Sequence, residues 1–177
     1  MIMNRVWAMP SRDTFDCKPI GAFVQRYLAQ SKISIDPFAR NKRWATYTND
    51  LNPETLAEYH MDAVDFLIML ADKGIKADLV LLDPPYSQYA VARCYKDIGR
   101  EYKAFGEDNN CVLYKRVKDA CMSILTDDAT ILTFAWNSTG MGKKRGFAIE
   151  DILLVCHGGA RNDTICVAEK RTQIRLL

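Results

Sequence analysis

An acidic residue, two prolines and a tyrosine follow one another at residues 83–86, at the end of an apolar run. The run itself, Leu79–Leu82, is typical of a strand buried on both faces of a parallel sheet. The two prolines lack N–H donors and fix their own φ, so they end the strand and stiffen the segment. We therefore expect a carboxylate and an aromatic ring at the carboxyl end of a central strand, where open α/β sheets bind ligands.

Asp83-Pro84-Pro85-Tyr86 resembles a motif of the amino-methyltransferases, and this resemblance implies that these residues activate a planar amine. The exocyclic amine of adenine is a poor nucleophile because its lone pair is delocalised into the ring. The carboxylate of Asp83 and the carbonyl of Pro84, held rigid by Pro85, can accept hydrogen bonds from the two N–H groups of this amine and make its lone pair available. The ring of Tyr86 can stack on a base turned out of a duplex, a contact worth about 1–3 kcal/mol. The alternative is a strand end followed by a proline-stiffened turn without chemistry.

The sequence Asp83-Pro84-Pro85-Tyr86 resembles motif IV of the S-adenosylmethionine-dependent amino-methyltransferases, chiefly the N6-adenine DNA methyltransferases. The resemblance implies that these four residues are catalytic, that S-adenosylmethionine is the cofactor, and that nucleic acid, DNA first, is the partner. Aspartate at the first motif position favours adenine N6 over cytosine N4. An RNA or protein amino-methyltransferase would share the motif, and a catalytically idle methyltransferase-like binding subunit is a further alternative.

A second match to this family lies upstream, where the short strand predicted at residues 33–35 leads into Asp36-Pro37-Phe38. This segment resembles motif I, so the resemblance implies that Asp36, Pro37 and Phe38 bind the cofactor. The fuller family motif continues with glycines that let the backbone approach the cofactor closely. This chain has Arg-Asn-Lys at residues 40–42 instead, and the missing glycines are what motivate the idle-subunit alternative.

Two more acidic residues stand where the family binds the cofactor. Asp50 follows the strand-like residues 45–48, and an acidic residue at the end of the second strand commonly binds ribose hydroxyls. The alternative there is an Asx turn or an N-cap before a helix predicted over Glu54–Tyr59. Asp62 resembles the motif III acid that reaches the adenine amine of the cofactor. It fits equally well as the N-cap of a helix predicted over Ala63–Leu70.

The N-terminal part occupies the place of motif X, which helps to cover the cofactor in this family. Thr14 and Phe15 are the candidate cofactor-binding residues there, and they precede an amphipathic helix predicted over Lys18–Gln30. Residues 1–17 show no periodicity and predict a loop. The alternative is a helix that only packs on the sheet.

Two groups of basic residues are candidates for contacts with a nucleic-acid backbone. Arg100 and Lys103 lie in a loop predicted over residues 99–110, beside the proposed site. Lys143, Lys144 and Arg145 lie in a glycine-flanked loop after a strand predicted over residues 129–136. In both places the alternative is a solvated charged segment.

The order of these segments predicts the fold class. We expect an α/β, single-domain Rossmann-like methyltransferase fold over residues 1–177, with a mostly parallel seven-stranded sheet and a C-terminal antiparallel β-hairpin formed by residues 151–156 and 164–168. Residues 1–30 would form the N-terminal loop and helix. The short loops leave no separate target-recognition domain, so we expect a loose sequence preference, recognition by the loops around residues 99–110 and 137–147, or a partner that supplies specificity. A homodimer is the other candidate assembly.

The composition is that of an ordinary globular protein, with 49% hydrophobic and 26% charged residues and a net charge of +2. Such a charge permits nucleic-acid binding without arguing for it. No apolar run approaches the roughly 18 residues of a membrane span, and no secretion signal is evident. The chain has six cysteines without a C-x-x-C pair and only two histidines, so we predict no metal site and a cytoplasmic protein with buried thiols.

Overall fold

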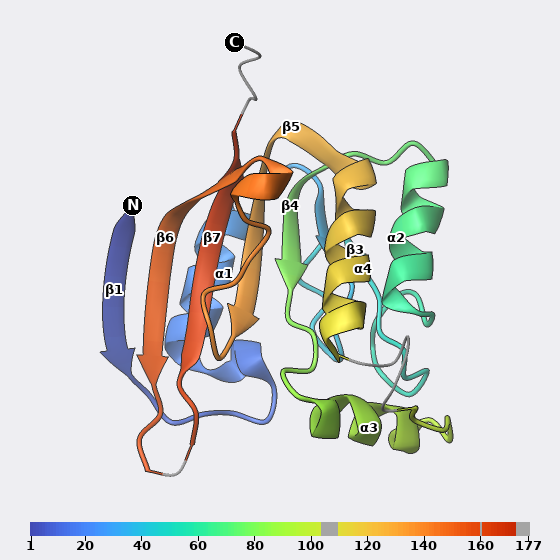
Figure 1. Ribbon diagram of the computed structural model, residues 1–177, viewed down its shortest axis with the longest axis horizontal. Helices are drawn as coiled ribbons and strands as arrows, with labels where there is room; N and C mark the ends of the chain where they lie inside the picture. The colour runs from blue at the N-terminus through green and yellow to red at the C-terminus, as the bar shows by residue number, and fades with distance from the viewer. Residues whose placement is uncertain (104–109, 160, 173–177) are drawn as a thin grey trace.

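The chain folds into three layers, with helices on both faces of a seven-stranded sheet as counted over the described residues (Figure 1). This computed structural model describes residues 1–103, 110–159 and 161–172. The sheet order is β1-β6-β7-β5-β4-β2-β3. The strands are β1 (Ile2–Trp7), β2 (Ser34–Asp36), β3 (Tyr47–Thr48), β4 (Ala77–Leu82), β5 (Leu125–Ala135), β6 (Phe147–Cys156) and β7 (Thr164–Arg171). The helices are α1 (Lys18–Leu28), α2 (Ala63–Asp72), α3 (Gln88–Asp97) and α4 (Asn110–Ile124), with the 3-10 helices η1 (Thr14–Asp16) and η2 (Lys143–Arg145).

Strand β4 is buried on both faces, as its apolar run predicts. Leu79 and Leu81 pack in the cluster that contains the apolar side of α1, whereas Val80 and Leu82 pack with α2 and α4 on the other face. Each of these four side chains is at most 2% exposed. A strand covered by helices on both sides needs apolar residues at every position, and this requirement explains the uninterrupted run.

The predicted C-terminal hairpin is confirmed, and it makes the sheet mixed. Strand β7 lies between β5 and β6 and is antiparallel to both, whereas the other neighbouring strands are parallel. At the other side of the sheet β2 lies between β3 and β4. After β2 the chain forms β3 on one side of that strand and then crosses over to form β4 on its other side. Such a switch point opens a crevice at the carboxyl ends of the strands.

The N-terminal prediction was wrong in part, because residues 2–7 form strand β1 rather than a loop. This strand pairs in parallel with β6 at the edge of the sheet. Its side chains are mostly exposed, with Ile2 at 58% and Trp7 at 67%. Because the strand is held by backbone hydrogen bonds and buries little, its sequence carries no alternating pattern.

The helix predicted over Glu54–Tyr59 is also not formed. The backbone N–H groups of Glu58 and Tyr59 donate to the carbonyl of Thr48, at 3.1 and 3.0 Å, instead of to carbonyls four residues earlier. This segment therefore folds back onto the end of β3 as a series of turns. The prediction failed because a six-residue helix is too weak to compete with an available strand end.

The helices predicted over Lys18–Gln30 and Ala63–Leu70 are formed as α1 and α2, and only their C-terminal ends differ from the prediction. Gly74 follows the C-cap of α2 with a φ of 72°, as expected for a residue that ends a helix. All six cysteines are free thiols, and four of them are buried: Cys17, Cys121, Cys156 and Cys166. Within the described ranges, no helix is both long enough and apolar enough to cross a membrane.

Candidate active site

Asp83 is the first residue after β4 and lies in a strongly desolvated position. The hydroxyl of Tyr86 donates a hydrogen bond to its Oδ1 atom over 2.5 Å, and the side chain of Thr14 bonds to it as well. Burial raises the pKa of Asp83 to about 6, while the two hydroxyl donors and the nearby charge of Arg40 oppose this rise. The carboxylate is thus ionised at neutral pH and held in one orientation.

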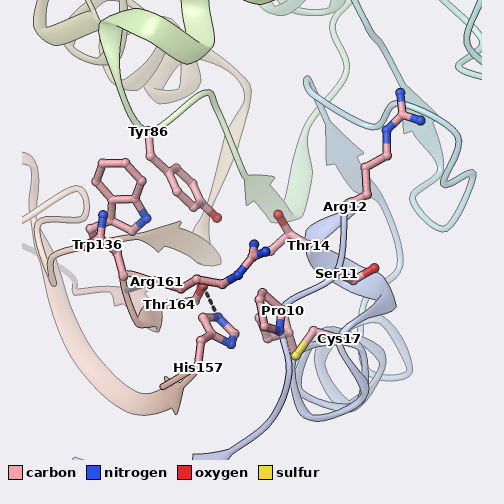
Figure 2. Close-up of a pocket in the computed structure, with 12 residues that line it drawn as sticks. Pro10, Ser11, Arg12, Thr14, Cys17, Tyr86, Trp136, His157, Arg161 and Thr164 are labelled. Atoms are coloured by element: carbon pink, nitrogen blue, oxygen red, sulfur yellow. Dashed lines mark hydrogen bonds between the residues drawn. The ribbon is translucent and has the colours of Figure 1, made fainter. Parts of the chain in front are cut away.

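A cleft of about 350 Å³ opens beside Tyr86 (Figure 2). Trp136, which follows β5, packs edge-on beside Tyr86 in the cleft wall, with its ring centre 5.8 Å from that of the tyrosine and tilted by 73°. The N-terminal segment and the β6–β7 turn complete the walls. Among the described lining residues, Arg12 and Arg161 are charged and none is acidic. The cleft is therefore suited to a flat ligand that carries negative charge.

His157 fixes the floor of this cleft. One ring nitrogen lies 2.8 Å from the carbonyl oxygen of Ala8 and the other 2.9 Å from the hydroxyl of Thr164 (Figure 2). The side chain is 5% exposed. Both ring nitrogens are thus occupied, so His157 joins the β6–β7 turn to the segment after β1 and supports the cleft as a structural residue.

A second set of acidic side chains lies at the switch point of the sheet. Asp36 ends β2 and is 2% exposed. Its pKa is raised well above the ordinary value, first by burial and then by the negative charges of Asp83 and Asp50. Burial also raises the pKa of Asp50. The structure therefore brings these three predicted residues close enough for their charges to interact, and we call them the acidic cluster.

The loop after β2 keeps the backbone shape of a glycine loop although it lacks glycines. Arg40 has a φ of 48°, in the left-handed region that favours glycine. Its backbone N–H donates to Oδ2 of Asp50 over 3.1 Å, and its guanidinium pairs with Asp13 at 2.7 Å. Arg40 thus has a backbone conformation that favours glycine and carries a charged side chain as well.

The other predicted cofactor-binding residues take mixed positions. Asp62 caps α2, with its Oδ1 atom accepting from the N–H of Val64 over 2.9 Å, which confirms one of its two interpretations. Asp50 forms the Asx turn that was its alternative role, since its Oδ1 atom accepts from Asn52 over 2.9 Å. Phe15 is 6% exposed and packs in the core, so it supports the site from beneath.

Pro37 and Phe38 form the turn that follows β2. The carbonyl of Pro37 accepts a hydrogen bond from the side-chain amide of Asn49 over 3.1 Å. The amide of Phe38 donates to Oδ1 of Asp36 over 3.0 Å, and its ring packs against the core on the α2 side. These contacts shape the loop at the switch point.

The basic residues do not gather at one place. Strand β6 is parallel to β5, so Lys143, Lys144 and Arg145, which precede β6, lie at the edge of the sheet opposite to Asp83 (Figure 1). The guanidinium of Arg145 is paired with Asp119 at 2.7 Å, whereas the two lysines are exposed.

Arg100 and Lys103 follow α3, which lies at the same edge as the candidate site (Figure 1). The guanidinium of Arg100 stacks over the ring of Tyr95 at 4.5 Å. Residues 104–109 of the predicted loop lie outside the described residues. A contact of either group with nucleic acid stays a prediction.

Sequence reasoning missed Trp136, Arg161 and Tyr114. Trp136 carried a usable signal, because it is an aromatic residue directly after a buried strand, as Tyr86 nearly is. Tyr114 lies in α4 with a pKa raised first by burial and then by the charge of Asp83. Arg161 reaches the cleft from the β6–β7 turn, and nothing in the local sequence marks it. No group of three or more potential metal ligands occurs among the described residues.

Comparison with solved structures places the fold among methyltransferases. TrmN from Thermus thermophilus is 12% identical with a TM-score of 0.57, covering 88% of this chain and 49% of TrmN. NSun6 from Pyrococcus horikoshii with SFG is 14% identical with a TM-score of 0.54, covering 84% of this chain and 50% of NSun6. A Burkholderia thailandensis 1,6-didemethyltoxoflavin-N1-methyltransferase, with that compound and S-adenosylhomocysteine bound, is 12% identical with a TM-score of 0.53, covering 88% and 78%.

The chain spans about half the length of the first two of these proteins. No protein-family model and no curated protein sequence matches it. At such low identities the similarity concerns the fold, which is the α/β fold of methyltransferases with a mixed sheet. The expected fold class is confirmed at that level.

Proposed function

We propose that this chain is an S-adenosylmethionine-dependent methyltransferase that modifies an exocyclic amine, with adenine N6 in DNA as the first candidate. One observation carries the proposal. Asp83 links two groups of residues, because it accepts a hydrogen bond from Tyr86 in the cleft wall and its charge raises the pKa of Asp36 in the acidic cluster. A planar acceptor in the cleft and a cationic donor beside the acidic cluster would therefore meet at this carboxylate.

The acidic cluster suits a cationic cofactor. The pKa values of Asp36, Asp50 and Asp83 are all raised, chiefly because burial leaves their charges without enough compensation. S-adenosylmethionine brings positive charge to such a site, and when bound it supplies an electrophilic methyl group on its sulfonium. Asp50 and Asp36 are the residues that would hold its adenosine part.

The cleft side supplies the residues that prepare the acceptor. Asp83 accepts one N–H of the amine and the carbonyl of Pro84 accepts the other, which makes the lone pair available. Because the rings of Tyr86 and Trp136 are tilted by 73° to each other, one of them can stack on the base while the other contacts its edge. After transfer the amine carries a surplus proton, and Asp83 can accept it at a carboxylate oxygen. Positioning supplies most of the rate, since no strong base is required.

The charge of the cleft favours a nucleic acid over a protein as the acceptor. Its described lining carries Arg12 and Arg161 and no acidic residue, so it would attract phosphate and repel a lysine ammonium. A protein acceptor, an RNA acceptor and a catalytically idle subunit are the alternatives that the experiment must separate.

The test is methyl transfer from labelled cofactor onto duplex DNA, single-stranded DNA, RNA and a protein mixture, in parallel with the Asp83→Ala variant. We expect label in DNA that depends on Asp83 and resides on adenine N6. Label found only in RNA, or only in protein, would identify that polymer as the acceptor instead of DNA. A cofactor titration by calorimetry completes the test, because absence of binding up to millimolar concentration would favour the idle subunit.

A further inference from the structure

We infer that Glu169 and Lys118 position Trp136, and with it one wall of the cleft, by fixing the backbone that follows β5. This inference rests on the proposed function and adds two positioning residues to it. The segment concerned is residues 137–142, which we call the strap. It begins directly after Trp136, and the connection to which it belongs runs back over the sheet to the start of β6 (Figure 1).

Trp136 is held only weakly by its own side chain. It is 46% exposed, and its ring contact is the tilted one with Tyr86. Within the described part of the chain, its indole N–H forms no hydrogen bond. Because β5 ends at Ala135, the direction in which the ring of Trp136 points depends on the path of the backbone that follows.

Glu169 binds the far end of the strap through two backbone N–H groups. Those of Met141 and Gly142 donate to its Oε2 and Oε1 atoms, at 2.5 and 2.9 Å. Glu169 lies on β7 and is 1% exposed, so its carboxylate is desolvated. A buried carboxylate requires donors that compensate its charge, and here the strap backbone provides them. The strap is therefore bound to the sheet by both oxygens of one buried side chain.

Gly140 allows the strap to lie directly against this carboxylate. A β-carbon at Gly140 would overlap the carboxylate of Glu169. The φ of Gly140 is outside the left-handed region, so a side chain is excluded here by the close contact and not by the backbone conformation. An alanine at this position would consequently push the strap and Glu169 apart.

Lys118 holds the near end of the strap from α4. Its ammonium group donates to the carbonyl of Thr139 over 3.2 Å, and the residue is 7% exposed. The N–H of Thr139 donates to the side-chain oxygen of Asn137 over 2.9 Å, which closes a turn directly after the tryptophan. Burial lowers the pKa of Lys118, and the negative charge of Glu169 opposes this effect. The two buried charges thus attract each other and hold the strap from two different elements.

A short connection with two buried charges is more firmly held than its own turns require. Burial of charged side chains costs free energy, and turns on a surface normally form without such charges. The first side chain whose direction the strap determines is that of Trp136. A ring that is already held in place loses less freedom when a base binds, so the expected benefit is a tighter acceptor complex.

The experiment is a double-mutant cycle on the acceptor KM, with the polymer that accepts the methyl group. Glu169→Gln puts an NH2 group against backbone donors, Gly140→Ala displaces the strap by contact, and Lys118→Met removes the donor to the strap carbonyl. Each should raise the acceptor KM about 5- to 20-fold, with kcat changed less than about threefold, because the effect of removing the ring itself, about 10- to 100-fold, is the upper limit. In the Trp136→Ala background each should raise KM less than about twofold, since the ring through which they act is gone.

Asp78→Asn is the matched control for a purely structural effect. Asp78 also accepts hydrogen bonds from two backbone N–H groups of another segment, those of Lys32 and Ile33 at 2.8 and 3.1 Å. It lies near the start of β4, at the other end of this strand from Asp83. Its loss should lower the Tm and leave the acceptor KM within about twofold, because no contact connects it to the strap.

A second readout does not require activity. The quenching of Trp136 fluorescence by iodide, measured as the difference between each protein and its Trp136→Phe counterpart, should increase in Glu169→Gln and in Gly140→Ala. Thermal unfolding establishes which variants are folded, and if Glu169→Gln is not, the other two carry the comparison.

Equal effects on KM with and without Trp136, or unchanged quenching in folded variants, would overturn the inference and leave the proposed function standing. A wild-type protein that transfers no methyl group to any polymer would overturn the proposed function. The quenching result would then still support or overturn the positioning of Trp136 by itself.

Discussion

The hydroxyl of Tyr86 donates a hydrogen bond to Oδ1 of Asp83 across the two prolines that separate them. The sequence predicts a stacking ring at Tyr86, and the hydrogen bond adds a second role. Because the prolines hold the backbone rigid, the tyrosine fixes the orientation of the carboxylate and also forms a wall of the cleft. Loss of its ring and loss of its hydroxyl should therefore have separable effects.

Replacement of Asp83 by alanine should reduce turnover by about 10²- to 10³-fold, the range for removing one preorganised polar group from an active site. Cofactor affinity should fall less than turnover, because Asp83 acts on the cofactor side only through its charge. Asp50→Ala, in contrast, should weaken cofactor binding and leave the acceptor KM unaltered. Single-turnover rates and calorimetry measure the two quantities. Unchanged turnover in Asp83→Ala would refute the catalytic assignment.

Removal of the Tyr86 hydroxyl alone should change the pH profile. The hydroxyl lowers the pKa of Asp83, which burial raises to about 6, so Tyr86→Phe should move that pKa upward. Because the ionised carboxylate is the active form, the acidic limb of kcat/KM should shift to higher pH. The acceptor KM should be preserved, since the ring remains. A profile identical to that of the wild type would show that the hydrogen bond is not maintained during catalysis.

Trp136 should contribute to acceptor binding. The residue is 46% exposed and packs edge-on beside Tyr86 in the cleft wall. Trp136→Ala should raise the acceptor KM by about 10- to 100-fold, corresponding to one lost stacking contact of about 1–3 kcal/mol. Trp7→Ala is the matched control, because Trp7 is 67% exposed on β1 and does not line the cleft. Equal effects of the two variants would contradict a stacking role.

Asp62 should contribute mainly to stability. Its carboxylate accepts from the N–H of Val64 and caps α2. Asp62→Ala should lower the free energy of unfolding by about 1 kcal/mol, whereas Asp62→Asn should lower it much less, since asparagine caps helices well. Urea denaturation measures both values. A large loss of cofactor affinity in Asp62→Asn with normal stability would instead favour the motif III role.

The unliganded protein should become less stable as pH rises from about 4 to 6, the interval between the ordinary pKa of Asp83 and its raised value of about 6. Asp36 and Asp50 also have raised pKa values. In this interval the folded state holds more protons than the unfolded state, so the free energy of unfolding falls with pH. The lowered pKa of Asp78 acts in the opposite direction, but only below its ordinary value of 3.8.

Thermal unfolding measures this effect directly. The Tm should be higher at about pH 5 than at about pH 7.5, and Asp83→Asn should reduce the difference because its amide does not titrate. A Tm that increases over this interval would show that the carboxylates are compensated in the folded protein.

The features that the sequence predicted correctly depend on residues close together in the chain. The apolar run of β4 and its proline end, the capping position of Asp62 and the glycine end of α2 each require only a few neighbouring residues. The same holds for the C-terminal hairpin, whose two strand-like runs flank a short connection. The acidic residues at the ends of β2 and β4 were predictable because carboxyl ends of parallel strands meet at one edge.

Only the tertiary structure decided which of these ends meet and what lies between them. Strand β1 formed because β6 offered it backbone partners, and the pairing of β4 with β5 placed Trp136 beside Tyr86. The direction of β6 put Lys143 and Lys144 at the edge opposite to Asp83. These relationships depend on the pairing and direction of strands far apart in the chain, so no local pattern encodes them. The sequence by itself determined the residue types at the candidate site, and the pairing and direction of the strands decided which residues line its cleft.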